Sequence, residues 1–383
     1  KSNMHVIREV DDRDMLKNVY QDSEFYDLNI DKLGDAFKHD ITRVFQHDKF
    51  DKISVLNDYM FLLSLCGNDF VLSMPFLKIN KDGEKMLIAI YHEIRMHHEG
   101  YLIRYNPDDP NDIPTVNIKF FKEFMLEISK REDTAMKAQQ ESLDRLMNGF
   151  RSKHDIENES SMTPIEIIQN RYTNLQVCSP FHPLYEQYHE EFKKIDYKKE
   201  YEEWKEEYYN YFMNINKKDE EEYYRVRMDV VQNYLESIMF ALRYYLKGCP
   251  SWNWHYKFRM SPLISDIREY LEKDVGDMNN FEFNMGTPYK PFQQLMLILP
   301  PQMNILMPEP FQKIMTDDKL LCTQFYPTEA RLDVAVGFKT MSSETILPEI
   351  NEELLMGTIE KFESKLSPSE VERNTIRNKP FMC

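Results

Sequence analysis

The sequence predicts an α/β segment followed by a mostly helical region, and three observations lead to this fold class. Glycine is scarce, with 10 residues in 383, which disfavours phosphate loops, β-barrels and propellers and favours helix. Hydrophobic residues make up 42% of the chain and charged residues 30%, a globular composition. Apolar residues recur at three- and four-residue steps, the spacing of one helix face. This length predicts one large domain or two coupled domains.

Residues 1–130 are expected to form the α/β segment. A short strand is predicted over 5–10, and a buried helix over 56–65 ends before Gly67, which suits a left-handed C-terminal cap. The remaining elements expected here are a helix over 85–98 that ends before Gly100, a Pro/Asp loop over 106–114 and a helix over 116–128.

Residues 131–165 are predicted to form a polar helical connector, and residues 166–383 a mostly helical second region. The connector is charged and nearly free of Gly and Pro, which is compatible with an exposed helix or with a mobile linker. The strongest helical pattern lies over 224–247, where apolar residues share one face and Gly248 stands where the helix should terminate. We expect this segment to be a core helix.

Charge and cysteine content limit the classes of function. The net charge is −17, so binding of nucleic acid would need a local basic or aromatic site. The five cysteines are widely spaced and form no CxxC, which disfavours a disulfide framework or zinc site and indicates a reducing, intracellular compartment. The longest apolar runs are too short to cross a bilayer and no signal peptide is visible, so no membrane partner is expected. His92, His97 and His98 lack the i,i+4 spacing of zinc pairs and are expected on the surface.

Asp69 is the first candidate functional residue. It lies in a Gly-Asn-Asp turn directly after the predicted buried helix, between Leu65 and Phe70. A carboxylate at such a position is presented as a metal-binding acid would be. The alternative is a structural turn or cap, and the residue types alone leave both open.

Trp252 and Trp254 form the second candidate site, because two of the three tryptophans lie within three residues, beside Lys257 and Arg259. Aromatic faces next to cations offer a stacking platform for a base and counter-charges for its phosphate. The alternative is an aromatic plug that packs under the preceding helix.

Taken together, these segments resemble the Xrn family of 5′→3′ exoribonucleases over nearly the whole chain. The turn Gly67-Asn68-Asp69-Phe70 with Pro75 is similar to the family's GNDFLPxxP, and the block 244–254 is similar to its YYYxGCxSWxW. The other matching pieces are Val6-Ile7-Arg8-Glu9, Gly100-Tyr101-Leu102, Ser265-Asp266, Pro291-Phe292-Gln293-Gln294-Leu295-Met296, Phe325-Tyr326-Pro327 and Arg373-Asn374. The probability that this many motifs agree in the same order by chance is very small.

The resemblance implies an enzyme that degrades single-stranded RNA with a 5′-monophosphate processively to mononucleotides, with Mg²⁺ (or Mn²⁺) as cofactor. It implies Asp69 as a catalytic, metal-binding acid, and Trp252 or Trp254 as the residue that stacks on the terminal base. The substrate-binding set expected from it is Asn68, Trp252, Trp254, Tyr256, Lys257 and Arg259. The implied fold is the edge of a three-layer PIN-like 5′-nuclease domain, followed by a predominantly α-helical second conserved domain.

The departures from the family pattern define a diverged member. The family's other metal-binding acids have no counterpart in this chain, so an N-terminal half is expected to complete it, as a segment of the same chain or as a partner chain. Lys257, Arg259 and Met260 replace Pro, His and Tyr of the family pattern. One hypothesis is therefore an active exoribonuclease, cytoplasmic in preference to nuclear; the alternative is a catalytically inactive scaffold that keeps the fold.

Overall fold

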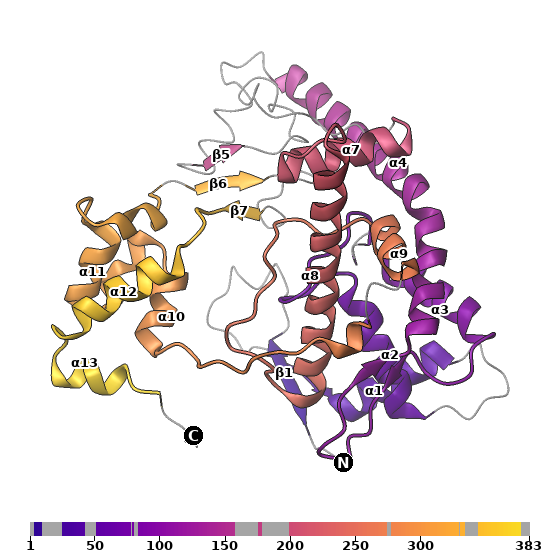
Figure 1. The fold of residues 1–383 in the computed structure, drawn as a ribbon, viewed down its shortest axis with the longest axis horizontal. Helices are drawn as coiled ribbons and strands as arrows, with labels where there is room; N and C mark the ends of the chain where they lie inside the picture. The colour runs from indigo at the N-terminus through magenta and orange to yellow at the C-terminus, as the bar shows by residue number, and fades with distance from the viewer. Residues whose placement is uncertain are drawn as a thin grey trace. The chain divides into compact units, whose positions relative to one another are not determined.

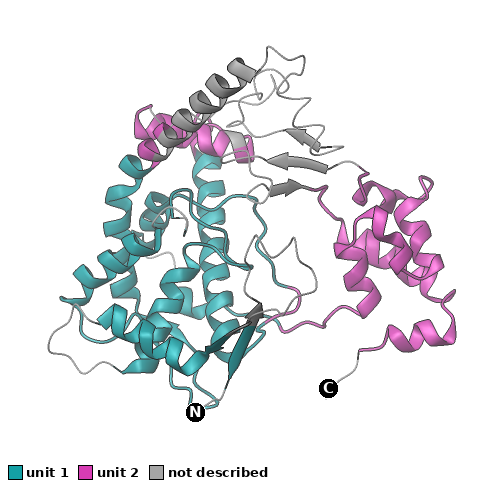
Figure 2. Ribbon diagram, turned by 180° about the vertical axis from the view of Figure 1, so that it is seen from behind, with its two compact units in different colours: residues 1–135, 221–250, 254–284 teal, residues 136–220, 251–253, 285–383 magenta. Residues whose placement is uncertain are grey.

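The structure is a computed structural model that describes residues 4–9, 25–42, 51–77, 79, 83–157, 175–177, 199–273, 277–328, 330–333 and 344–376. In this part of the chain the fold is mostly helical, and the strands are short (Figure 1). The chain divides into two compact units, coloured in Figure 2, and each is described by itself. Unit 1 comprises 1–135, 221–250 and 254–284, and unit 2 comprises 136–220, 251–253 and 285–383.

Unit 1 is built from helices and two pairs of short antiparallel strands. Its strand pairs are β1 (His5–Glu9) with β2 (Phe25–Asn29), and β3 (Ile103–Arg104) with β4 (Thr115–Val116). Its helices are α1 (Ile30–Thr42), α2 (Lys52–Ser64), α3 (Gly83–Arg95), the first part of α4 (Ile118–Glu157), α8 (Glu220–Lys247), α9 (Ile264–Glu272) and the 3₁₀ turn η3 (Met278–Asn280). The predicted edge of a three-layer nuclease domain stays a prediction.

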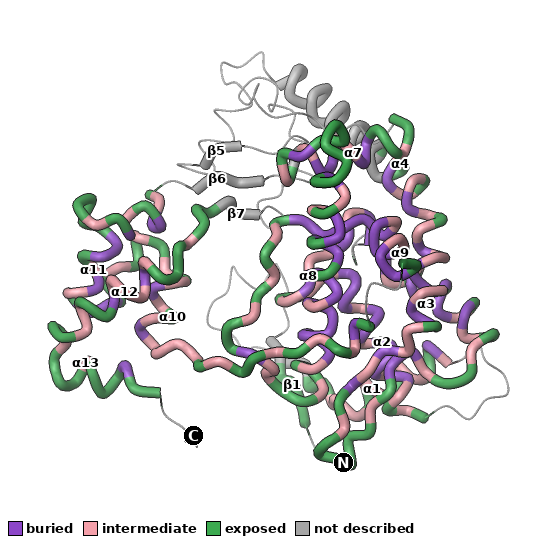
Figure 3. Tube along the Cα trace, viewed as in Figure 1, coloured by how far each residue is buried: buried purple, intermediate pink, exposed green. Residues whose placement is uncertain are grey.

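The core of unit 1 lies between α2, α3, α4 and α8, whose buried stretches are purple in Figure 3. Helix α2 starts at the cap Asp51, whose carboxylate accepts the Ser54 N–H at 2.7 Å. Phe61 of α2 meets Phe121 of α4 edge-on, with ring centroids 5.8 Å apart. Helix α8 buries most of the positions from Val230 to Leu242 and ends at Gly248, which has φ +100°.

The predicted helices over 56–65, 85–98 and 224–247 are confirmed as α2, α3 and α8. The helix expected over 116–128 is longer than predicted, because α4 continues to Glu157. The helical alternative for the connector therefore holds over residues 131–157. The last eight residues of the predicted connector, 158–165, lie outside the described residues. The predicted division into two domains at residues 131–165 stays a prediction. Helix α8 follows that connector in the chain, and most of it belongs to unit 1 together with residues that precede the connector.

The expected surface position of His98 is wrong. Its side chain is only 8% exposed, and its ring packs 4.9 Å from that of Phe120. Its Nε2 lies 2.5 Å from a carboxylate oxygen of Glu123. Both partners come from α4, so the histidine fixes the end of α3 against that helix.

Unit 2 holds the remaining elements. They are β5 (Leu175–Val177), α7 (Tyr201–Met213), α10 (Pro291–Ile298), η4 (Pro301–Leu306), α11 (Glu309–Thr316), η5 (Leu321–Phe325), β6 (Ala330–Asp333), β7 (Glu344–Ile346), α12 (Glu352–Glu363) and α13 (Pro368–Arg373). Strand β6 pairs in parallel with β5 and antiparallel with β7. Helices α10, α11 and α12 enclose a core that includes Met296, Phe311 and Ile359.

Three motifs of the sequence analysis meet in unit 2. The side-chain oxygen of Asn374 accepts the N–H of Phe292, at the start of α10, at 2.9 Å. The hydroxyl of Tyr326, from the Phe-Tyr-Pro motif, donates to the buried carbonyl of Met296 at 2.7 Å. These motif residues therefore join distant segments into one core.

Candidate functional site

The Gly-Asn-Asp turn is a fixed structure. Gly67 has φ +100°, and a Cβ there would lie 2.9 Å from the backbone nitrogen of Ser73, so only glycine fits. The side-chain oxygen of Asn68 accepts the N–H groups of Phe70 at 2.8 Å and of Val71 at 2.9 Å. The Asn68 side chain, predicted to bind substrate, is thus occupied in closing the turn.

Helix α8 supports the turn from one side. The Phe70 ring lies 5.2 Å from that of Phe240 and 4.6 Å from that of Tyr244. The hydroxyl of fully buried Tyr234 donates to the Leu72 carbonyl at 3.0 Å. These contacts fix the backbone that follows residue 69.

Asp69 itself is exposed at the tip of this turn. Its charge bears on Tyr245, whose pKa is raised first by burial and then by the carboxylate of Asp69. The turn is therefore structural, as one of the two alternatives has it, while the exposed carboxylate leaves metal binding by Asp69 as a prediction.

The described residues contain no group of three or more His, Cys, Asp or Glu side chains that could bind a metal ion. Mg²⁺ in proteins is bound through one or two carboxylates together with water and phosphate oxygens. Asp69 offers a single carboxylate, so the described residues supply at most one of the ligands that a metal site needs.

Trp254 has the packing of the core-plug alternative. Its ring stacks on Phe240 at 4.8 Å and meets Phe283 edge-on at 5.8 Å. The indole Nε1 donates to Glu236 at 3.3 Å. One face and the polar edge of this half-buried side chain therefore serve the packing of unit 1.

Trp252 differs from Trp254 in being 51% exposed. Its backbone N–H donates to the Met285 carbonyl at 2.8 Å, and Gly286 beside it approaches the Asn253 side chain so closely that a Cβ would clash. The backbone is thus held by unit 2 while the indole remains accessible.

The three other predicted binding residues follow in unit 1. The Tyr256 hydroxyl donates to the Met260 carbonyl at 2.7 Å, and burial raises the pKa of this tyrosine. Lys257 and Arg259 are exposed, and the N–H of Lys257 donates to the side chain of Asn233 on α8 at 2.9 Å. Tyr256 is therefore engaged internally, and the two cations face solvent.

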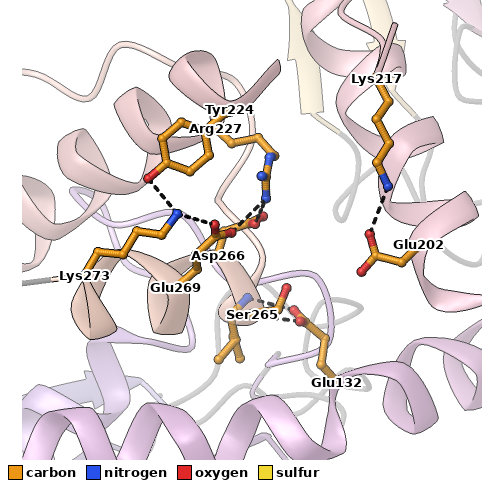
Figure 4. Close-up of polar contacts among 10 residues, drawn as sticks. Glu132, Glu202, Lys217, Tyr224, Arg227, Ser265, Asp266, Glu269 and Lys273 are labelled. Carbon is orange, nitrogen blue, oxygen red and sulfur yellow. Dashed lines mark hydrogen bonds and ion pairs between the residues drawn. The ribbon is translucent and has the colours of Figure 1, made fainter. Parts of the chain in front are cut away.

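The Ser265-Asp266 motif is part of a buried polar network that sequence reasoning did not predict (Figure 4). Glu132, fully buried, accepts the N–H groups of Ile264 at 2.8 Å and Ser265 at 3.0 Å and so caps α9. Asp266, also fully buried, forms an ion pair with Arg227 of α8. The partners lie 39 to 133 residues apart, so no local pattern could reveal them.

No helix of the described residues is long and apolar enough to cross a membrane.

Comparisons with known proteins agree with the resemblance drawn from the motifs. The family model described as Xrn1 helical domain matches residues 49–201 and 184–383. 5′-3′ exoribonuclease 1 of Saccharomyces cerevisiae is 23% identical over 458 residues, which cover 94% of this chain and 29% of that protein. 5′-3′ exoribonuclease 2 of Gallus gallus is 25% identical over 399 residues, covering 93% of this chain and 40% of that protein.

Identity rises over shorter stretches. 5′-3′ exoribonuclease 2 of Aspergillus oryzae is 36% identical over 169 residues, covering 44% of this chain and 15% of that protein. The chain spans less than half the length of each of these relatives. With the family model matched over most of its length, this chain belongs to the Xrn family of 5′→3′ exoribonucleases, as a diverged member.

Proposed function

We propose that this chain is part of a 5′→3′ exoribonuclease that degrades 5′-monophosphorylated RNA processively to mononucleotides. Its relatives are named as 5′-3′ exoribonucleases, and the observation that carries the proposal is the presentation of Asp69. The acid is exposed, while the turn around it is closed by Asn68 and packed through Phe70 against α8. A rigid backbone beneath an exposed carboxylate is what a site needs to position a reacting phosphate.

Asp69 would serve as one ligand of a Mg²⁺ or Mn²⁺ ion, which supplies polarisation of a phosphate and activation of water when bound. Because the described residues offer no further clustered ligands, we assign no chemical step to the metal here. We propose that the remaining acids, together with the rest of a three-layer PIN-like nuclease domain, come from a segment outside these residues, in the same chain or in a partner chain.

Trp252 is the better candidate for stacking on the terminal base. A stacking platform needs a free ring face, and Trp252 is 51% exposed, whereas Trp254 is stacked on Phe240. Tyr256 and Asn68 act by fixing the backbone beside the site, since their polar groups are engaged within the protein.

We further propose an intracellular and mainly cytoplasmic location. Among the described residues, Cys66 and Cys322 are free thiols, which agrees with a reducing compartment.

The second candidate function is an inactive scaffold. The observation that favours it is the lack of clustered metal ligands among the described residues, together with the departures at Lys257 and Arg259. A scaffold would keep the buried networks of both units and would tolerate replacement of Asp69.

The test uses the complete natural protein with Mg²⁺ and measures mononucleotide release from 5′-phosphorylated and 5′-hydroxyl RNA. We expect release that depends on the phosphate and falls by about 100-fold or more in Asp69→Asn, since a metal ligand contributes several kcal/mol to the barrier. Asp108→Asn, at an exposed loop acid of unit 1, is the matched control and should keep the parent rate. Equal rates in Asp69→Asn and Asp108→Asn would exclude the role of Asp69. A folded protein with no release would favour the scaffold.

A further inference from the structure

The segment that follows the tryptophans alternates between inward and outward side chains. Tyr256 and Phe258 are half-buried, with their rings 5.8 Å apart, whereas His255, Lys257 and Arg259 are exposed. A period of two is the pattern of extended backbone, in which alternate side chains share one side. The three basic side chains therefore occupy alternate, solvent-exposed positions of the segment.

The segment is fixed to the body of unit 1. The N–H of Lys257 donates at 2.9 Å to Asn233, which is itself only 6% exposed on α8. The Tyr256 hydroxyl bonds the Met260 carbonyl at 2.7 Å, and Met260 is buried. A basic side chain on a fixed backbone loses less conformational entropy on binding than one on a loose loop.

The charges of Lys257 and Arg259 are not neutralised within the described residues. Other cations of unit 1 pair with carboxylates, as Arg225 does with Asp229 and Lys273 with Glu269, but no ion pair with a described carboxylate involves residue 257 or 259. In a chain of net charge −17, positive charge left unpaired at alternate positions of a fixed segment is suited to an anionic ligand.

We propose that His255, Lys257 and Arg259 form a basic ladder that binds consecutive phosphates of single-stranded RNA. Side chains at alternate positions of extended backbone recur at about 7 Å, so successive rungs can follow a polyanion along its length. The ladder rests on the proposed function for the identity of the polymer as RNA. It is a feature of this chain, because Lys257 and Arg259 stand where the family pattern has other residues.

The test measures binding of a fluorescent single-stranded RNA to the complete natural protein in EDTA, from about 50 to 200 mM salt. Each phosphate contact to a single strand contributes about 0.7 to the slope of log K against log salt. Lys257→Gln/Arg259→Gln should therefore reduce the slope by about 1.4. Over this fourfold salt range, the parent should lose about sevenfold more affinity than the variant. Lys32→Gln/Lys319→Gln removes the same charge from exposed positions elsewhere and should keep the parent slope.

The outcomes separate the ladder from the nuclease. A parent that does not bind RNA, or a ladder variant with the parent's slope, overturns the ladder. The same titration is made with poly-glutamate in place of RNA. If the ladder variant has a smaller salt slope than the parent for poly-glutamate but the parent's slope for RNA, the ladder is also overturned, and an acidic protein partner is indicated. Because binding is measured without divalent metal, a protein that fails to release mononucleotides but shows the reduced slope keeps the ladder and loses the nuclease.

Discussion

Asp58 on α2 is a fully buried carboxylate whose ionisation can be measured in the stability of the protein. It accepts hydrogen bonds from the Tyr91 hydroxyl at 2.6 Å and from the backbone N–H groups of Leu102 at 2.9 Å and Ile103 at 2.7 Å. Burial raises the pKa of Asp58 from 3.8 to about 6, because the loss of water outweighs these three hydrogen bonds.

The raised pKa fixes the sign of the pH dependence. Between about pH 4 and pH 6 the folded protein retains a proton that the unfolded chain has released. The free energy of unfolding therefore decreases as pH rises through this window, and this group adds no further change above it. At about 1.36 kcal/mol for each pKa unit, the shift from 3.8 to about 6 corresponds to about 3 kcal/mol.

The assay compares urea unfolding of the parent and Asp58→Asn at several pH values from about 4 to 7. Asparagine does not ionise, so the stability of the parent relative to the variant should fall by about 2 to 3 kcal/mol over this range. Tyr91→Phe is a second variant that keeps the carboxylate and removes a hydrogen bond that lowers the pKa of Asp58. It should extend the window to higher pH. Equal pH slopes in the parent and both variants would refute the reasoning.

Two further predictions concern buried polar contacts, one in each unit. Asp266→Asn removes one partner of the buried pair with Arg227 and should lower the free energy of unfolding by about 3–5 kcal/mol. The control, Glu272→Gln, comes from an exposed pair on the same helix and should cost less than about 1 kcal/mol. Similar costs for the two variants would argue against the buried network. In unit 2, Tyr326→Phe leaves the buried Met296 carbonyl without its hydroxyl donor and should cost about 1–3 kcal/mol, measured by thermal unfolding; an unchanged melting temperature would contradict that role.

The helices of unit 1 were predictable because their signals are local. Periodic apolar residues and a glycine at the end mark α2 and α8, and both glycines have the positive φ expected of a cap. The expectation that the whole segment 224–247 is a core helix extends one turn too far, since Tyr245 near its end is 45% exposed. A tyrosine fits either a core or a surface, so the periodicity alone could not place it.

The functional residues were harder to predict because their roles depend on distant partners. Asn68 is predicted to bind substrate, which stays a prediction; the part of its side chain that closes the turn, the amide oxygen, bonds N–H groups that the spacing did not indicate. The motif residue Asp266 pairs with Arg227, 39 residues away, and the burial of His98 depends on Glu123, 25 residues away. Sequence spacing gives residue types and their order, whereas these contacts are set by how α4, α8 and α9 pack.

The order in which unit 1 is assembled also bears on how the protein is made. Tyr234, which fixes the Leu72 carbonyl of the Asp69 turn, lies 162 residues later in the chain. At roughly 5–20 residues per second, translation delivers this partner about 8 to 32 s after the turn has been synthesised. During that interval Phe70 also lacks Phe240 and Tyr244, its ring partners on α8. The nascent chain therefore carries an unfinished aromatic surface on the ribosome, where chaperones have time to bind before the turn is fixed.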